Sequence, residues 1–271
     1  MDEVLARLKN EKLIGRLTEM DSLLVAFSGG VDSTFLLALA SRVLEENVLA
    51  VTASSVTHPS KERKEAIEFA EARGIQHVVF QSDALSLPEF VANGPDRCYH
   101  CKKFISQRLI EIAQERGIKH VAHAANMDDL GDYRPGLRAA REMGILSPLV
   151  EVKLGKEEIR FLSRQMGLST WDKQSMACLA SRIPYGDAIT EKKLSMVEAA
   201  EDLLAKNGFS RFRVRHHGHV ARIEVESSEI KNIIEPELRK DLVDKIRKIG
   251  FTHIAVDLEG YVSGSMNRVL R

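Results

Sequence analysis

The sequence predicts an α/β protein, with a parallel sheet flanked by helices and a smaller C-terminal α+β domain. Residues 23–40 read as a buried strand, a glycine-rich loop and a helix, and up to residue 166 short apolar runs alternate with helical patterns. That alternation is typical of βαβ units. After an irregular segment at 168–190 the pattern changes, and the 271 residues suffice for two domains. We therefore expect one domain at 1–187 and a second at 188–271.

Each element follows from its apolar spacing and its end signals. Residues 1–20 are amphipathic, and residues 23–27 have the length of a buried strand. Gly74 and Gly117 each follow a helical pattern, as glycine does at helix ends. The remaining predicted helices are 34–40, 59–73, 104–116, 135–143, 156–166, 191–206 and 236–249, and the remaining strands are 48–52, 77–80, 118–123, 211–216, 220–226 and 253–258.

Composition excludes several classes of protein. The 39 basic and 39 acidic residues cancel, which argues against a dedicated nucleic-acid binder. Hydrophobic content of 44% and charged content of 29% are typical of a globular protein. We find no signal peptide and no apolar run of membrane-spanning length, so we expect a cytoplasmic protein with no membrane partner. Three cysteines are too few for a disulfide scaffold, which leaves them for chemistry or metal binding.

The segment SGGVDS, between the first predicted strand and its helix, has the features of a phosphate site. Unpaired amide groups and the helix dipole attract an anion there. Gly29 and Gly30 let the backbone approach a phosphate, and Ser28 and Ser33 add hydroxyl donors. Asp32 suits a helix cap or a Mg²⁺ ligand. The alternative is a simple glycine turn capped by serine.

SGGVDS lacks the lysine of a Walker A loop and resembles the PP-loop of the ATP pyrophosphatases. That resemblance implies ATP and Mg²⁺ as cofactors, with cleavage of ATP to AMP and pyrophosphate. The second half of the nucleotide site is predicted at residues 123–129, after the fourth strand. There Asn126 can read a base edge, and Asp128 or Asp129 can bind a ribose hydroxyl or Mg²⁺. Asp132-Tyr133-Arg134-Pro135-Gly136 follows; the alternative is a polar turn capping the next helix.

The cysteines form the second group of candidate site residues. Cys98 and Cys101 are three residues apart, on one face if helical, and Cys178 lies in the irregular segment. Four interpretations stay open: an iron–sulfur cluster with one open iron, a zinc site completed by His100 or water, a redox pair, or passive thiols. Nearby cations would lower the thiol pKa values; they are Arg97, Lys102, Lys103 and Arg182.

An arginine-rich hairpin supplies a third candidate site. With a turn at His217-Gly218, strand alternation places six charged side chains on one face: Arg211, Arg213, Arg215, Arg222, Glu224 and Glu226. Arginines held by glutamates suit bidentate binding of phosphate or carboxylate. The alternative is a solvated face with cross-strand ion pairs. The opposite face is predicted as core, with Phe212, Val214, Ala221, Ile223 and Val225.

Taken together, SGGVDS, RCYHCK, NMDDLGDYRPG, CLASRIPYG, the arginine hairpin and DLEGYVSGSMN resemble the LarE family over nearly the whole chain. Members are ATP-dependent sulfur transferases that mature the nickel-pincer nucleotide cofactor of lactate racemase. The resemblance implies that carboxylates of pyridinium-3,5-biscarboxylic acid mononucleotide, a small nucleotide substrate, are adenylylated and then converted to thiocarboxylates.

The same resemblance implies roles for individual residues. Asp32, Cys178 and Arg182 are expected in catalysis, and Arg213 and Arg215 at the substrate phosphate. Some members consume a single cysteine, which would be Cys178 here; others have three cysteines and a [4Fe-4S] cluster. Because this chain has all three, the cluster form is favoured, with Cys98, Cys101 and Cys178 as ligands. A homo-oligomer is also implied, and a sulfur-delivery protein is left open.

Three rival functions can be distinguished by experiment. A tRNA thiolase would bind tRNA in a salt-sensitive way, but the zero net charge argues against it. An ammonia-dependent amide synthetase would be indifferent to replacement of all three cysteines. A non-catalytic nucleotide-binding module would bind ATP without releasing pyrophosphate.

Overall fold

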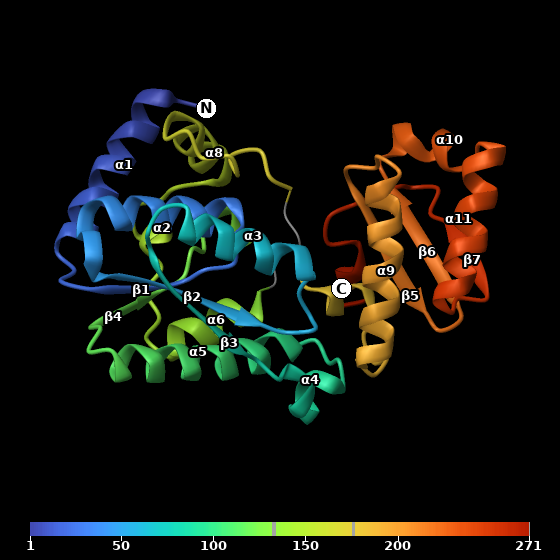
Figure 1. Ribbon diagram of the computed structural model, residues 1–271, viewed down its shortest axis with the longest axis horizontal. Helices are drawn as coiled ribbons and strands as arrows, with labels where there is room; N and C mark the ends of the chain where they lie inside the picture. Colours follow the sequence, from blue (N-terminus) through green and yellow to red (C-terminus); the bar gives the residue numbers. More distant parts are fainter. Residues whose placement is uncertain (132–133, 175–176, 271) are drawn as a thin grey trace. The chain divides into compact units, whose positions relative to one another are not determined.

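The computed structural model describes residues 1–131, 134–174 and 177–270 (Figure 1). The chain divides into two compact units, Met1–Ala84 with Cys98–Met176 and Leu85–Arg97 with Ala177–Arg271. This division differs from the predicted domains, which placed 85–97 and 177–187 in the first domain. The difference arises because residues 85–97 pack on the segment after Cys178, a contact that sequence periodicity does not report.

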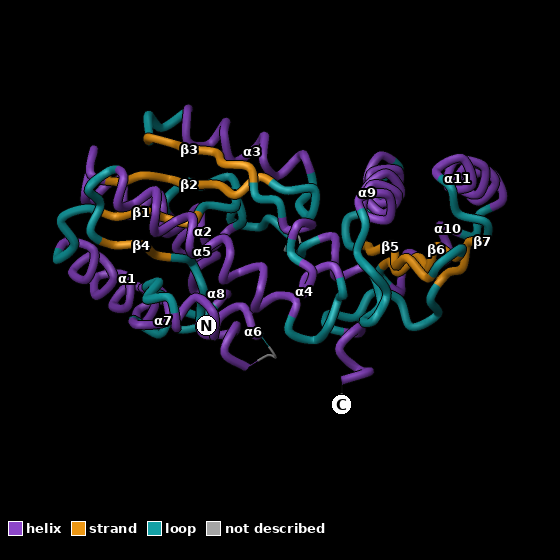
Figure 2. Tube along the Cα trace, turned by 90° about the horizontal axis from the view of Figure 1, so that it is seen from below, coloured by secondary structure: helices purple, strands orange, loops and turns teal. Residues whose placement is uncertain are grey.

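The first unit is built on a four-stranded parallel sheet. Its strands are β1 (Leu23–Ala26), β2 (Val48–Ser54), β3 (Gln76–Gln81) and β4 (His120–Ala122), in the order β3-β2-β1-β4 (Figure 2). Leu146 adds a parallel bridge to Ala122 at the β4 edge. The predicted α/β class with a parallel sheet is confirmed.

Alternating strand residues bury the two faces of this sheet under different helices. Leu23 and Val25 join a core with α1, α2 and α8, whereas Leu24 joins a second core with Leu109 and Ile112 of α5. In Figure 1, α2 and α3 accordingly lie on one face and α5 on the other. The helices of this unit are α1 (Glu3–Thr18), α2 (Val31–Leu44), α3 (Ser60–Glu71), α5 (Arg97–Glu115), α6 (Pro135–Glu142), α7 (Pro148–Glu151) and α8 (Lys156–Gln165).

The second unit is a three-stranded sheet covered by helices. The order is β5-β6-β7, with β5 and β6 antiparallel and β6 and β7 parallel. The predicted inward face is confirmed, since Phe212, Val214 and Ile223 are among the buried core residues. The elements of this unit are α4 (Pro88–Val91), α9 (Glu191–Lys206), β5 (Phe212–His217), β6 (Val220–Val225), α10 (Ile230–Ile233), α11 (Pro236–Ile249) and β7 (His253–Val256).

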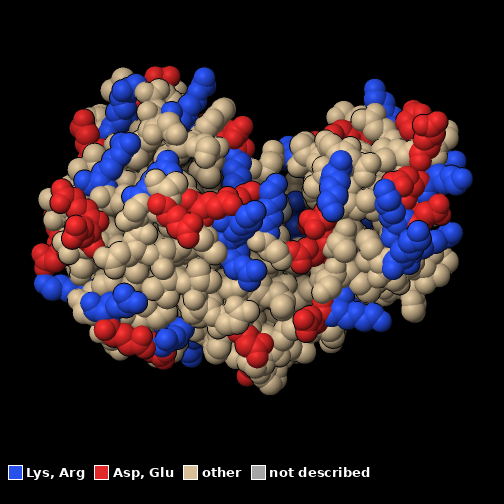
Figure 3. Space-filling view, in the orientation of Figure 1, with Lys and Arg blue, Asp and Glu red and all other residues tan. Residues whose placement is uncertain are grey.

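Two kinds of element differ from the sequence-based expectation. Helix α5 begins at Arg97, whereas a start at residue 104 was predicted, because its first two turns are polar and carry no apolar periodicity. The single-turn helices α4, α7 and α10 were not predicted, because four residues are too few to show a period. Acidic and basic side chains alternate over the visible face (Figure 3), in keeping with the balanced net charge.

Candidate active site

The PP-loop connects β1 to α2 at the carboxyl edge of the parallel sheet. The strand order reverses between β1 and β4, and ligands of open α/β sheets bind at such a point. Gly30 is the N-cap residue of α2, so the first amide groups of the helix face the loop. The Ser28 and Ser33 hydroxyl oxygens lie 3.0 Å apart, and Ser33 Oγ also accepts from the Ser28 amide at 3.3 Å. The structure thus brings the predicted loop residues together.

Gly29 is required by both conformation and space. Its φ is +72°, a conformation that side chains disfavour, and an added Cβ would lie 3.2 Å from Ala66 Cβ on α3. Gly29→Ala should therefore distort the loop and weaken ATP binding about tenfold or more, since misplaced binding groups are costly. Equilibrium binding of ATP with Mg²⁺ measures this. The control is Gly74→Ala, at φ +63° with open space around it. Equal loss of affinity in both variants would contradict the prediction.

Asp32 points toward a lysine that the sequence analysis did not select. Lys156 Nζ, from the first turn of α8, donates to Asp32 Oδ2 at 2.6 Å. The other carboxylate oxygen is buried and has no hydrogen-bond partner among the described residues. Burial raises the pKa of Asp32 although Lys156 opposes this, and the charge of Asp129 raises the pKa further. Asp32 is thus a partly desolvated carboxylate with one unbonded oxygen, and a second carboxylate, Asp129, is near enough to affect its pKa. Such an arrangement is suited to a hard cation such as Mg²⁺.

The loop after β4 is hydrogen-bonded to the same lysine. The backbone amide of Lys156 donates to Asp128 Oδ2 at 2.6 Å, so one residue contacts both halves of the predicted nucleotide site. Asp129 forms an ion pair with Arg134 at 2.8 Å and accepts from the Asn126 amide at 3.0 Å. Asn126 is buried, and its side-chain oxygen accepts from the Asp128 amide. Its role in reading a base stays a prediction.

Two other parts of this loop have defined positions. His123 is buried with Nε2 2.8 Å from Ser147 Oγ, and burial, with the charge of Lys102, lowers its pKa to about 3. It is therefore neutral near pH 7. Of the predicted segment at 132–136, Asp132 and Tyr133 lie outside the described residues, and Gly136 opens α6 against the start of α5.

A second lysine secures the PP-loop from the other side. Lys173 Nζ donates to the Gly29 carbonyl at 2.8 Å and pairs with Glu65 at 2.7 Å. It lines a pocket of about 610 Å³ against α3. Lys156 and Lys173 were not among the residues predicted from the sequence. For Lys156 the available signal was its position directly after Gly155, at the start of a predicted helix close to the sheet edge; Lys173 carried no local signal.

The cysteines lie on two different units. Cys98 and Cys101 are in the first turns of α5, three residues apart, and the structure assigns them to the first unit. Cys178 precedes a short 3₁₀ turn, Leu179–Arg182, in the second unit. None of the three is in a disulfide. Within the described residues, no group of three or more histidine, cysteine or acidic side chains is close enough to hold a metal ion.

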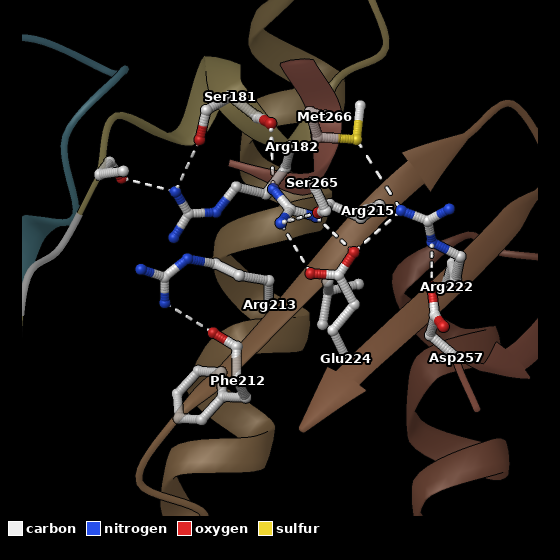
Figure 4. A network of polar contacts seen from close by, with 12 residues as sticks. Ser181, Arg182, Phe212, Arg213, Arg215, Arg222, Glu224, Asp257, Ser265 and Met266 are labelled. Carbon is white, nitrogen blue, oxygen red and sulfur yellow. Dashed lines mark hydrogen bonds and ion pairs between the residues drawn. The ribbon is translucent and has the colours of Figure 1, made fainter. Parts of the chain in front are cut away.

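The centre of the arginine face of the second unit is buried, at Arg213, Arg215 and Glu224, and it is densely paired (Figure 4). Arg215 donates to both carboxylate oxygens of Glu224, at 2.9 and 2.6 Å, and Arg222 shares that carboxylate at 2.8 Å. Arg213 lies 5.0 Å from the Tyr261 ring centre. Burial lowers the pKa of Arg213, and the charge of Arg182 lowers it further. Closely spaced, partly desolvated guanidinium groups favour an anionic ligand such as a phosphate.

Arg182 is buried and held by several hydrogen bonds. It is 0% exposed and forms a bidentate ion pair with Glu201, with both distances 2.9 Å. It also donates to the carbonyl oxygens of Ala177 at 2.6 Å and Cys178 at 3.2 Å. Arg182 therefore holds the backbone at Ala177 and Cys178 by hydrogen bonds, and its part in catalysis stays a prediction.

These features define a PP-loop enzyme: a serine- and glycine-rich loop leads into a helix at the reversal point of a parallel sheet. A family model described as the PP-loop domain matches residues 3–131. A pyridinium-3,5-bisthiocarboxylic acid mononucleotide synthase from Lactiplantibacillus plantarum is 36% identical over 97% of this chain and 95% of its own. An uncharacterized Synechocystis protein is 40% identical over 97% and 98%. The chain belongs to the LarE family.

More distant similarity marks the wider class. A subunit of a GMP synthase from Thermoplasma volcanium is 25% identical over 68% of this chain and 63% of its own. The predicted family and the prediction of an ATP-dependent sulfur transferase are thus confirmed. No helix among the described residues combines the length and apolar character needed to cross a membrane.

Proposed function

We propose that this enzyme adenylylates carboxylates of pyridinium-3,5-biscarboxylic acid mononucleotide and converts them to thiocarboxylates, in nickel-pincer cofactor biosynthesis. The observation that carries the proposal is the near full-length similarity to a synthase whose name states the bisthiocarboxylic product. The PP-loop and the arginine face support the proposal, because such a reaction needs two anion sites, one for ATP and one for a substrate phosphate.

In the first half-reaction the PP-loop and Lys156 hold the ATP phosphates. Asp32 and Asp129 would hold Mg²⁺, which when bound would neutralise charge on the phosphates. A substrate carboxylate oxygen attacks the α-phosphorus, the bond to the β-phosphate oxygen breaks, and pyrophosphate leaves. The product is an acyl-adenylate, whose leaving group is AMP.

In the second half-reaction a sulfur nucleophile attacks the acyl carbon and AMP departs. Arg213 and Arg215 hold the phosphate of the nucleotide substrate, while Arg182 keeps the backbone at Cys178 in place. The balance is one sulfur gained and one carboxylate oxygen lost as part of AMP. A homo-oligomer and a partner protein that delivers sulfur both stay predictions.

Iron–sulfur clusters are bound by cysteine thiolates, and the three cysteines of this chain are side chains of that kind. Cys98 and Cys101 lie one helical turn apart on α5, and neither they nor Cys178 are oxidised to a disulfide. We propose that the three cysteines hold a [4Fe-4S] cluster, which when bound would supply transferable sulfide. The alternative is that Cys178 itself gives up its sulfur.

The test is anaerobic purification followed by iron and sulfide analysis, an absorption spectrum, and a single turnover with ATP and the dicarboxylate substrate. We expect a near-stoichiometric cluster, AMP and pyrophosphate formation, thiocarboxylate product and an unchanged protein mass. Cys98→Ser should lose iron and sulfur transfer but keep pyrophosphate release, because the PP-loop is untouched. A protein mass lower by one H₂S would identify sacrificial Cys178. AMP formation that depended on tRNA would contradict the substrate assignment.

A further inference from the structure

Two neighbouring carbonyl groups of the PP-loop are held in different ways. The Gly30 carbonyl accepts from the Thr34 amide at 2.9 Å, which is the first backbone bond of α2. The Gly29 carbonyl accepts from Lys173 Nζ at 2.8 Å, and this charged side chain is 144 residues away in sequence. Because a peptide unit is planar, whatever fixes the Gly29 carbonyl also fixes the direction of the next amide. The bond from Lys173 therefore acts on the anion site itself.

The peptide unit between Gly29 and Gly30 has its two polar groups on opposite sides. The described residues contain no cis peptide bond, and in a trans peptide the carbonyl and the following N–H point in opposite directions. The carbonyl faces Lys173, while the Gly30 amide donates to Ser28 Oγ, which lies 3.0 Å from Ser33 Oγ. That amide bond is long, at 3.4 Å, so a phosphate oxygen can replace it.

Lys173 reaches the loop from a segment that α8 holds in place. Arg160 on α8 donates to the carbonyl oxygens of Trp171 at 2.9 Å and Lys173 at 2.8 Å. The Arg164 guanidinium lies 5.2 Å from the Trp171 ring centre, and the Lys173 amide donates to the Thr170 carbonyl at 3.0 Å. The backbone that carries the Lys173 side chain is therefore fixed before the ammonium group contacts the loop.

Helix α3 supplies the second partner of the same ammonium group. Lys173 Nζ lies 2.7 Å from a carboxylate oxygen of Glu65. The next residue, Ala66, is where a Cβ on Gly29 would come within 3.2 Å, so the loop packs closely on α3 here. Because Glu65 neutralises the ammonium charge, Lys173 supplies a directed hydrogen bond more than a free positive charge. All of these contacts lie within the first unit.

We propose that Lys173 is a positioning residue that sets the orientation of the Gly29–Gly30 peptide and so presents the Gly30 amide to the pyrophosphate part of ATP. The inference rests on the ATP half of the proposed function. A peptide unit between two glycines can rotate at little steric cost, so it needs a bond from outside the loop. The rotated peptide would turn a carbonyl oxygen toward the anion. Lysine suits the position, because its three N–H donors serve a carbonyl and a carboxylate together.

The decisive variant is Lys173→Met, which keeps the length of the side chain and removes its donors. The matched control is Lys9→Met, since Lys9 is also 19% exposed and donates to Glu158 at 2.6 Å instead of to a loop carbonyl. Glu65→Gln removes the counter-charge and leaves Lys173 as a donor to Gly29. Titration calorimetry of the full-length chain measures the affinity for pyrophosphate with Mg²⁺ and, separately, for AMP. Melting temperatures show that each variant is folded.

We expect Lys173→Met to weaken pyrophosphate binding about tenfold or more and AMP binding less than about twofold, since AMP lacks the group that the Gly30 amide contacts. Lys173→Ala, with a smaller side chain, should show the same selective loss. Lys9→Met and Glu65→Gln should bind pyrophosphate within about threefold of wild type, because part-exposed ion pairs contribute little.

Unchanged pyrophosphate affinity in Lys173→Met, or an equal loss of AMP affinity, would overturn the inference. An equal loss of pyrophosphate affinity in Lys9→Met would also overturn it, and so would one in Glu65→Gln, which would assign the effect to the ion pair. If the wild-type chain binds neither pyrophosphate nor ATP, the proposed function fails together with the inference. If the wild type binds both and Lys173→Met binds them equally well, the inference alone fails.

Discussion

Asp32→Asn should make the protein more stable at neutral pH while lowering ATP-dependent adenylylation by about a hundredfold or more, the scale expected for loss of a key electrostatic group. Catalysis falls because the variant loses the carboxylate proposed to hold Mg²⁺ beside the PP-loop. Stability rises because burial raises the pKa of Asp32 in spite of Lys156, which means that the folded chain disfavours the ionised form.

The pH dependence follows from the direction of that pKa shift. A carboxyl group with a higher pKa in the folded chain than in the unfolded chain stabilises the fold fully below the unfolded pKa. That contribution is lost as the pH rises through the folded pKa. At neutral pH the ionised Asp32 therefore lowers the free energy of unfolding, and Asp32→Asn removes this destabilisation. Removing a destabilising charge from a functional site typically raises the free energy of unfolding by about 0.5–2 kcal/mol. For a chain of this size, each kcal/mol raises the melting temperature by about 2–4 °C.

Thermal unfolding without nucleotide, from about pH 4 to pH 8, measures the effect, and pyrophosphate release measures the loss of activity. The advantage of Asp32→Asn should shrink as the pH falls, because wild-type Asp32 then becomes neutral. Lys156→Met is the control: it removes the ion-pair partner and leaves the carboxylate buried, so it should lower stability as well as ATP affinity. A variant less stable than wild type at pH 7, or a gain that is constant with pH, would show that burial does not dominate at Asp32.

The buried pair of Arg182 and Glu201 should give the largest stability effect. Glu201→Gln leaves the Arg182 guanidinium, which is 0% exposed, without its counter-charge. Removing one partner of such a pair typically costs about 3–5 kcal/mol. Glu201 also accepts from the Val214 amide at 3.0 Å, so it connects the turn after Cys178 to β5. We expect the free energy of unfolding of the second unit to fall by that amount in denaturant titrations.

A double variant separates stability from positioning. Arg182→Gln combined with Glu201→Gln removes both charges and keeps an acceptor for the Val214 amide. It should recover at least half of the stability lost in Glu201→Gln, since a neutral pair has no unbalanced charge. Sulfur transfer should stay low, because the bonds from Arg182 to the carbonyls of Ala177 and Cys178 are gone. Glu201→Gln within about 0.5 kcal/mol of wild type would show that the pair contributes little.

Several properties of this protein were determined by local sequence alone. The buried apolar run before SGGVDS specifies a strand, loop and helix, because Gly29 and Gly30 permit the turn and the following residues have helical apolar spacing. The hairpin is equally local: alternation alone places Arg213, Arg215 and Glu224 on one face of the strands. The predicted turn was one residue too early, because in the structure His217 pairs with Val220 and the turn is Gly218-His219. Patterns of this kind depend only on residues a few positions apart, so periodicity reveals them.

Tertiary structure decided what brings distant residues together. Lys156 reaches Asp32, and Asn93 binds the turn at Ile183–Asp187, through contacts between segments far apart in sequence. The partition of 85–97 into the second unit and the burial of Arg182 against Glu201 belong to the same group. Local propensity carries no information about such pairs. The free energy of each such pair depends on how far its groups are desolvated and which hydrogen bonds they form. Both are set only when the whole chain has packed.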